Sequence, residues 1–290
     1  MTNKIIKTLI LDKSIRLYFT DNTKMLQEIM ELSKIKDKTC YLALAKAVSI
    51  MSLLSVTLKD NQRISAVITL TDKNYKMYVD TDAEGNVRGY VNQALLIAPQ
   101  QKNSNSTLQD FIGTKASIRI MKGFETNHFT GITDMPYQNL DDDFAYYFKQ
   151  SEQTDTMIQT KVKLDSVSYL FKSYGIYAQA LPGAEEGALD LVREQFEAEN
   201  LAPLLLSMND AGIEKELNQR FPNSKVLEHK PIQFACHCSK EMFYGFLYSL
   251  PVEELQNAVE SNTSIDTTCH ICGQNYVFIP SEIQTILQTR

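Results

Sequence analysis

Residues 236–238 read Cys236-His237-Cys238, and residues 269–273 read Cys269-His270-Ile271-Cys272-Gly273. The four cysteines form two close pairs, and Gly273 permits a tight turn after the last of them. Zinc prefers a tetrahedral set of thiolate or imidazole ligands, and four cysteines make a closed structural site with no open position for catalysis. The spacing therefore predicts one zinc ion per chain, held by Cys236, Cys238, Cys269 and Cys272.

The same cysteines allow two other assignments. They could remain as free thiol pairs or form disulfides that crosslink the C-terminal segment. Alternatively, His237 or His270 could replace one cysteine as a zinc ligand. In a reducing compartment, close pairs of cysteines more often hold metal than form permanent disulfides. We therefore favour a four-cysteine zinc site with both histidines beside the ligands.

The composition is that of an ordinary globular protein. The 290 residues are 43% hydrophobic and 22% charged, and this length favours about two domains. Lys and Arg number 29 against 35 Asp and Glu, a net charge of −6, so strong attraction to nucleic-acid phosphates is not expected. Nucleic acid is therefore not an expected partner.

Neither a targeting segment nor a membrane span is expected. Residues 1–13 reach Asp12 too early for a signal peptide and read as a first strand. The longest apolar tract, 47–58, is interrupted by serine and threonine and is judged too short and too polar to span about 30 Å of hydrocarbon. A cytoplasmic protein with no membrane partner is expected.

The pattern up to residue 183 predicts a mixed α+β domain with antiparallel strands and helices. We expect strands at 7–11, 14–20, 63–71, 75–81, 87–92, 116–122, 128–133, 157–164 and 168–181, and helices at 24–32, 39–58 and 141–153. Gly85 can take the positive φ that the turn at 82–86 needs, and 100–107 reads as a polar loop. Cys40 lies in the apolar second helix and needs no role beyond packing, and the aromatic run at 144–148 is interpreted in the same way.

A boundary is expected at Leu181-Pro182-Gly183-Ala184, where proline removes a ladder donor and glycine permits a turn. Residues 185–221 then read as amphipathic helices, and those around Leu201, Leu204, Leu205 and Met208 are too short to be stable alone. Two further short helices are expected at 240–250 and 251–260. The predicted organisation is an N-terminal domain (1–183), a helical linker (184–230) and a C-terminal zinc domain (231–290).

A four-thiolate zinc site can also act as a switch. Peroxide and hypochlorite attack thiolates, and oxidation removes the ligands from the metal. The folding free energy that zinc supplies, on the order of 10 kcal/mol in small zinc peptides, is then lost. A domain of this size would unfold.

The residues resemble a known family at several places. The two cysteine pairs match the C-x-C and C-x-x-C hallmark of the bacterial redox-regulated heat shock chaperone of about 33 kDa. The stretches 84–90 (Glu-Gly-Asn-Val-Arg-Gly-Tyr), 142–154 (from Asp-Asp-Phe to Ser-Glu-Gln-Thr) and 181–184 (Leu-Pro-Gly-Ala) are similar to other segments of that family. The resemblance covers nearly the whole chain.

The resemblance implies a zinc-dependent holdase that is inactive while reduced and zinc-bound. Oxidation would form disulfides within each pair, Cys236 with Cys238 and Cys269 with Cys272, and zinc loss would unfold the tail and destabilise the linker. The exposed surface, including Leu201, Leu204, Leu205 and Met208, would bind unfolding client proteins without ATP, often as a homodimer. The absence of a G-x-x-x-x-G-K-[ST] loop from the sequence agrees with an ATP-independent function.

Two other functions remain as alternatives. A zinc ribbon that binds nucleic acid or the translation machinery is disfavoured because acidic residues outnumber basic ones in 231–290. A thiol-disulfide oxidoreductase using Cys269 and Cys272 would normally place its cysteines at a helix N-terminus within a βαβ unit, a context that the pattern here does not suggest. We therefore expect a chaperone and not an enzyme.

Overall fold

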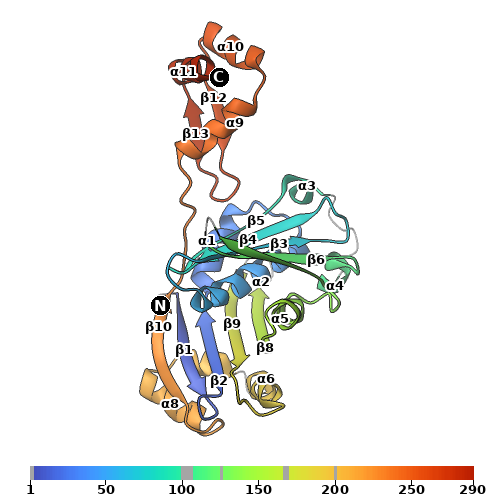
Figure 1. The fold of residues 1–290 in the computed structure, drawn as a ribbon, viewed down its shortest axis with the longest axis vertical. Helices are drawn as coiled ribbons and strands as arrows, with labels where there is room; N and C mark the ends of the chain where they lie inside the picture. The colour runs from blue at the N-terminus through green and yellow to red at the C-terminus, as the bar shows by residue number, and fades with distance from the viewer. Residues whose placement is uncertain (1–2, 99–106, 125–126, 166–169, 199–200) are drawn as a thin grey trace. The chain divides into compact units, whose positions relative to one another are not determined.

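The computed structural model describes residues 3–98, 107–124, 127–165, 170–198 and 201–290. The chain forms two compact units, Met1–Ala235 and Cys236–Arg290, and each is described by itself (Figure 1). The predicted α+β class, with antiparallel sheets and helices, is confirmed. The polar loop expected at 100–107 lies outside the described residues except for Thr107, which caps helix α4.

The first unit contains a five-stranded antiparallel sheet, called sheet A. Its strands in spatial order are β10 (Lys225–Pro231), β1 (Lys4–Ile10), β2 (Ile15–Asp21), β9 (Leu170–Ala180) and β8 (Thr156–Leu164). β1 and β2 form the predicted hairpin, in which Ile10 pairs with Ile15 and the turn residues 11–13 all have positive φ. β8 and β9 form the second predicted hairpin. β10 was not predicted as a strand.

A second, six-stranded sheet, called sheet B, completes the β-structure of this unit. Its order is β11 (Gln233–Phe234), β5 (Asn86–Val91), β4 (Lys76–Asp82), β3 (Arg63–Thr69), β6 (Ser117–Gly123) and β7 (His128–Asp134). β3 to β5 form the predicted antiparallel meander, and β11 pairs with β5 in parallel. Gly85 has φ +87° in the turn before β5, and a Cβ there would overlap the carbonyl oxygen of Pro231. Glycine is therefore required both by the turn and by the close approach of Pro231.

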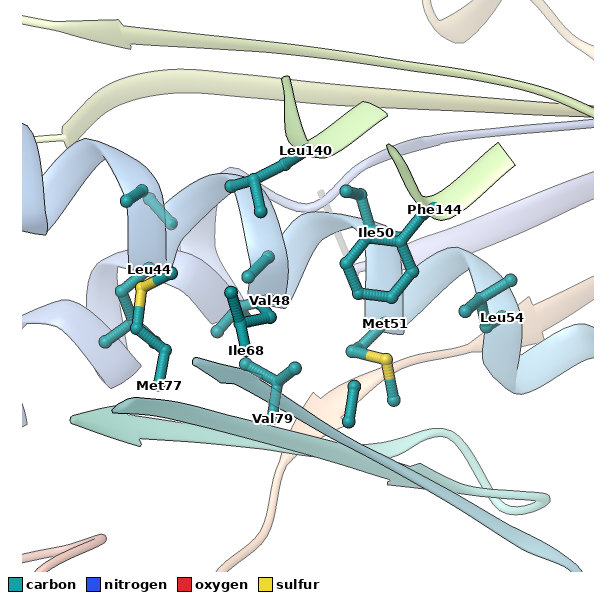
Figure 2. Packing of buried hydrophobic residues seen from close by; sticks show 14 of the residues in the cluster. Leu44, Val48, Ile50, Met51, Leu54, Ile68, Met77, Val79, Leu140 and Phe144 are labelled. Carbon is teal, nitrogen blue, oxygen red and sulfur yellow. The ribbon is translucent and has the colours of Figure 1, made fainter. Parts of the chain in front are cut away.

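Helix α2 (Lys38–Leu54) lies between the two sheets and forms the centre of the core (Figure 1). Asp37 caps it by accepting a hydrogen bond from the backbone N–H of Cys40, at 2.8 Å. Figure 2 shows α2 side chains packed between Val79 of β4 on one side and Phe144 of helix α5 (Leu140–Ser151) on the other. A helix enclosed in this way is apolar on nearly every face.

This position explains the composition of the longest apolar tract. With the short helix η1 (Ser55–Thr57), α2 forms a 20-residue stretch, Lys38–Thr57, that by length and composition could cross a membrane. The expectation considered residues 47–58 alone, whereas the length and composition of the whole stretch from Lys38 would be enough to span a membrane. However, 78% of its most apolar window is buried inside the protein. Packing between two sheets accounts for its apolar character.

Two smaller predictions about the core are confirmed. Cys40 is buried, and burial together with the nearby charge of Asp37 raises the pKa of its thiol to about 12, so it behaves as a small hydrophobe. Phe144, Tyr147 and Phe148 of α5 are also buried in the core. The remaining helices of this part of the unit are α1 (Thr23–Leu32), α3 (Gln93–Leu96) and α4 (Leu108–Ile112).

The predicted helical segment after Gly183 covers the second face of sheet A. It forms α6 (Ala188–Ala198), α7 (Leu201–Leu206) and α8 (Asp210–Asn218), called the linker helices. Their buried apolar residues form one cluster with those of the sheet; the cluster comprises Ile6, Ile10, Ile15, Leu17, Phe19, Met157, Ile176, Ala178, Val192, Phe196, Leu201, Ala202, Leu205, Ile213, Leu217 and Phe221. Leu201 and Leu205 are thus buried, Met208 packs against the cluster, and Leu204 is 42% exposed.

The second unit is small. It contains η2 (Lys240–Phe243), α9 (Tyr244–Ser249), α10 (Val252–Glu260), the antiparallel strands β12 (Ile265–Thr268) and β13 (Asn275–Phe278), and α11 (Pro280–Thr289). The helices predicted at 240–250 and 251–260 are confirmed. The buried apolar residues of the unit are Leu247, Leu255, Ala258, Phe278, Ile283 and Ile286. A core this small is marginal without a further crosslink.

Candidate metal centre

The four cysteines of the second unit come from two short, irregular segments. Cys236 and Cys238 flank His237, which has φ +51°, just before η2. Cys269 and Cys272 lie in the turn between β12 and β13. Within that turn the backbone N–H of Gly273 donates to the carbonyl oxygen of Cys269, at 2.9 Å, and Gly273 has φ +72°. Glycine therefore closes the turn as the sequence predicted.

The structure brings the four sulfur atoms together. All four Sγ atoms lie within 4.8 Å of one another. Cys236 Sγ is 3.5 Å from Cys269 Sγ, and Cys238 Sγ is 3.3 Å from Cys272 Sγ. A tetrahedral zinc ion with Zn–S bonds of about 2.3 Å would separate its sulfurs by about 3.8 Å. The donor set therefore fits a tetrahedral metal ion.

The pKa values of three of the cluster thiols are shifted, and not all in the same direction. Burial, followed by hydrogen bonding with Cys269, raises the pKa of Cys236, and burial is the main reason that the pKa of Cys272 is raised. At Cys238 burial acts in the same direction, but hydrogen bonds from Tyr276 and the neighbouring thiols outweigh it and lower the pKa. Four thiolates this close repel one another unless a positive charge compensates them. A divalent ion supplies that charge.

The histidines next to the cysteines are placed differently. His237 and His270 are exposed, and among the described residues the group of converging ligand atoms contains only the four cysteine sulfurs. The residue types are those that zinc selects in closed structural sites. The arrangement has no histidine ligand.

Side chains from β13 and α11 hold the first cysteine pair in place. The Tyr276 hydroxyl donates to the carbonyl oxygen of Cys238, at 2.9 Å, and is 3.1 Å from Cys238 Sγ. Lys240 forms an ion pair with Glu282 at 2.6 Å and lies over the ring of Phe278. These residues were not predicted from the sequence. Residues 275–278 read Asn-Tyr-Val-Phe, which do not alternate clearly between polar and apolar side chains, so no local pattern marked this strand.

The surroundings of Cys269 and Cys272 bear on the oxidoreductase alternative. These cysteines lie in the turn of an antiparallel hairpin, and β12 and β13 pair only with each other in the described structure. A thioredoxin-like C-x-x-C motif instead begins a helix after a strand in a βαβ unit. The structural context expected for that enzyme is not found at this motif.

The sequence is similar to those of known proteins along nearly its whole length. The family model described as Hsp33 protein matches residues 3–279. The chain is 26% identical to the 33 kDa chaperonin of Halalkalibacterium halodurans over 295 aligned positions, covering 99% of each chain. It is 26% identical to the 33 kDa chaperonin of Latilactobacillus sakei, again over 99% of each.

A solved structure shares the fold. The crystal structure of the 33 kDa chaperonin from Thermotoga maritima aligns with a TM-score of 0.81 at 18% identity, and the alignment covers 100% of this chain and 99% of that one. The family model spans both units, including all four cysteines of the cluster. The chain therefore belongs to the Hsp33 protein family.

Proposed function

We propose that this chain is a redox-regulated holdase chaperone of the cytoplasm, which binds unfolding proteins without ATP after its cysteine cluster is oxidised. The observation that carries the proposal is the convergence of four cysteine sulfurs from two segments to within 4.8 Å. Membership in a family whose relatives are named 33 kDa chaperonins supports the chaperone activity itself. The cluster supplies the means of regulation.

In the reduced state, Cys236, Cys238, Cys269 and Cys272 would hold one zinc ion. When bound, zinc crosslinks the segment before η2 to the hairpin β12–β13, and structural zinc contributes on the order of 10 kcal/mol to folding in small domains. The apolar core of residues 236–290 contains few buried side chains. The fold of this unit therefore depends on the crosslink.

Oxidation would convert the four thiols into two disulfides. For each disulfide, two thiols give two electrons and two protons to one hydrogen peroxide, which becomes two waters. We propose the pairs Cys236–Cys238 and Cys269–Cys272. Disulfides within the pairs leave the two segments unconnected, whereas disulfides between Cys236 and Cys269 and between Cys238 and Cys272 would keep them tied together. Only the first pairing removes the crosslink.

The linker helices supply the client-binding surface in this proposal. In the folded protein their apolar faces and the second face of sheet A cover each other. Only Ala235 separates the two-residue strand β11 from Cys236, so disorder that begins at the cysteines can spread through β11 into β10. Release of the helices would expose Leu201, Leu205 and Met208 beside the already exposed Leu204. A patch of several hundred Å² binds other proteins, including a second oxidised chain as a homodimer.

The direct test is suppression of client aggregation. Zinc-loaded, reduced protein is expected to leave the thermal aggregation of a model client nearly unchanged, and the same protein treated with peroxide or hypochlorite is expected to suppress it at near-stoichiometric ratios without ATP. Light scattering at a fixed temperature measures both. Equal activity in the two redox states would reject the regulation, and inactivity in both would reject the chaperone itself.

A further inference from the structure

The hydroxyl of Tyr276 is a polar side-chain group that lies against a cysteine of the cluster. It is 2.9 Å from the carbonyl oxygen of Cys238 and 3.1 Å from Cys238 Sγ. The backbone of Tyr276 pairs with Thr267 across the β12–β13 hairpin, and its ring centroid lies 4.9 Å from that of Phe243 in η2. The hydroxyl is therefore positioned by the packing of its ring.

We propose that Tyr276 is a positioning residue that sets how readily Cys238 is oxidised; this inference rests on the redox function proposed above. The single hydroxyl proton is shared between the carbonyl oxygen and the sulfur of Cys238, so the contact fixes the backbone of the first pair and also draws charge from the sulfur. A hydrogen bond to a thiolate stabilises its negative charge and makes the lone pair less available. Cys238 is thereby made a weaker nucleophile than the same thiolate without the tyrosine.

The contact slows the first of the two steps by which a disulfide forms. The sulfur of Cys238 attacks hydrogen peroxide, an S–O bond forms, the O–O bond breaks, and the departing hydroxide takes a proton to become water. The sulfur of a second cysteine then attacks the sulfenic acid, an S–S bond forms, the S–O bond breaks, and a second water leaves. The lone pair that attacks hydrogen peroxide is on the same Cys238 sulfur that accepts the hydrogen bond from Tyr276. Removal of the hydroxyl is therefore expected to accelerate that attack at Cys238.

The experiment compares Tyr276→Phe with wild type as zinc-loaded, full-length protein. The variant keeps the ring and its contact with Phe243 and loses only the donor. Peroxide-driven zinc release, followed with a chromogenic chelator, is expected to be roughly two- to fivefold faster, because nucleophilicity responds only partly to a change in the charge stabilisation of sulfur. Timed alkylation and mass spectrometry should assign the acceleration to Cys238, whereas the Tm of the reduced protein should change little.

The matched control is Tyr244→Phe. The ring of Tyr244 also packs in this unit, with its centroid 5.5 Å from that of Phe278, and no hydrogen bond from its hydroxyl to a cysteine is found among the described residues. This variant is expected to release zinc at the wild-type rate. A 3-fluorotyrosine at position 276, which is a stronger donor of the same shape, is expected to slow release and keeps the test decisive if the phenylalanine variant folds poorly.

Two outcomes would overturn the inference. One is a Tyr276→Phe variant that oxidises at the wild-type rate, which would mean that the hydroxyl serves the carbonyl oxygen alone. The other is equal acceleration by Tyr244→Phe, which would mean that general loosening of the unit is responsible. In either case a wild-type protein that still releases zinc on oxidation would leave the proposed function intact. A wild type that holds no zinc, or keeps it on oxidation, would reject the proposed function instead.

Discussion

Replacing Cys269 by serine is expected to abolish stoichiometric zinc binding and to unfold most of residues 236–290. Cys269 is the most buried of the four cluster cysteines, at 4% exposure, and its sulfur lies 3.5 Å from that of Cys236. Loss of a ligand should weaken metal binding by more than the roughly 10- to 100-fold typical of changing a residue that only supports a ligand. Without the crosslink, the small core of this unit does not balance the chain entropy lost on folding.

Metal analysis and hydrogen exchange measure this result. Amides of η2, the β12–β13 hairpin and α11 should exchange nearly as fast as in an unfolded peptide, whereas α2 and the strands around it should stay protected. Cys40→Ser is the matched control, because Cys40 is buried outside the cluster. It should lower overall stability by about 1–3 kcal/mol through burial of an unpartnered hydroxyl and still bind one zinc ion. Stoichiometric zinc and normal protection in Cys269→Ser would contradict the assignment of this ligand.

Leu205→Ser is expected to make the reduced, zinc-loaded protein an active holdase. Leu205 of α7 is fully buried in the cluster that joins the linker helices to sheet A. The substitution leaves a cavity and buries a hydroxyl, which together should weaken docking of the linker helices by about 3–5 kcal/mol. Helices as short as α7 have little stability of their own, so a loss of this size should release them.

The measurement is client aggregation under reducing conditions, together with hydrogen exchange in the linker helices. Leu191→Ser on α6 is the control, because Leu191 is 40% exposed and the same change in polarity should cost little there. It should remain inactive until oxidised. If Leu205→Ser shows rapid exchange across the linker helices and yet fails to suppress aggregation, the linker helices without Leu205 do not form a client-binding surface when released.

Much of this fold was accessible from sequence because the signals are local. The β1–β2 hairpin, the β3–β5 meander and helices α1 and α5 each follow a period of two or of 3.6 residues, and α2 was marked by its long apolar run. Gly85 and Gly273 were identified from turn chemistry alone, and both have positive φ. The four cysteines were predicted to converge because two close pairs at this spacing match the ligand geometry of zinc.

The parts that were missed depend on distant partners. β10 reads as a polar segment with no alternating pattern, and its pairing with β1 joins residues more than two hundred positions apart, supported by Lys7 with Glu228 and Lys4 with His229. β12 and β13 have four residues each, too few for a clear period. The contact between Tyr276 and Cys238 likewise requires the three-dimensional arrangement of the hairpin and η2. Local propensity carries no information about any of these pairings.

Native mass spectrometry of one preparation before and after peroxide treatment, followed by peptide mapping of the disulfides, tests the central claim most directly. The reduced protein is expected at the mass of the chain with one zinc ion. The oxidised protein is expected without zinc and lighter than the free chain by four hydrogens, with disulfides Cys236–Cys238 and Cys269–Cys272. A reduced chain without metal, an oxidised chain that keeps it, or disulfides joining Cys236 to Cys269 and Cys238 to Cys272 would contradict the claim.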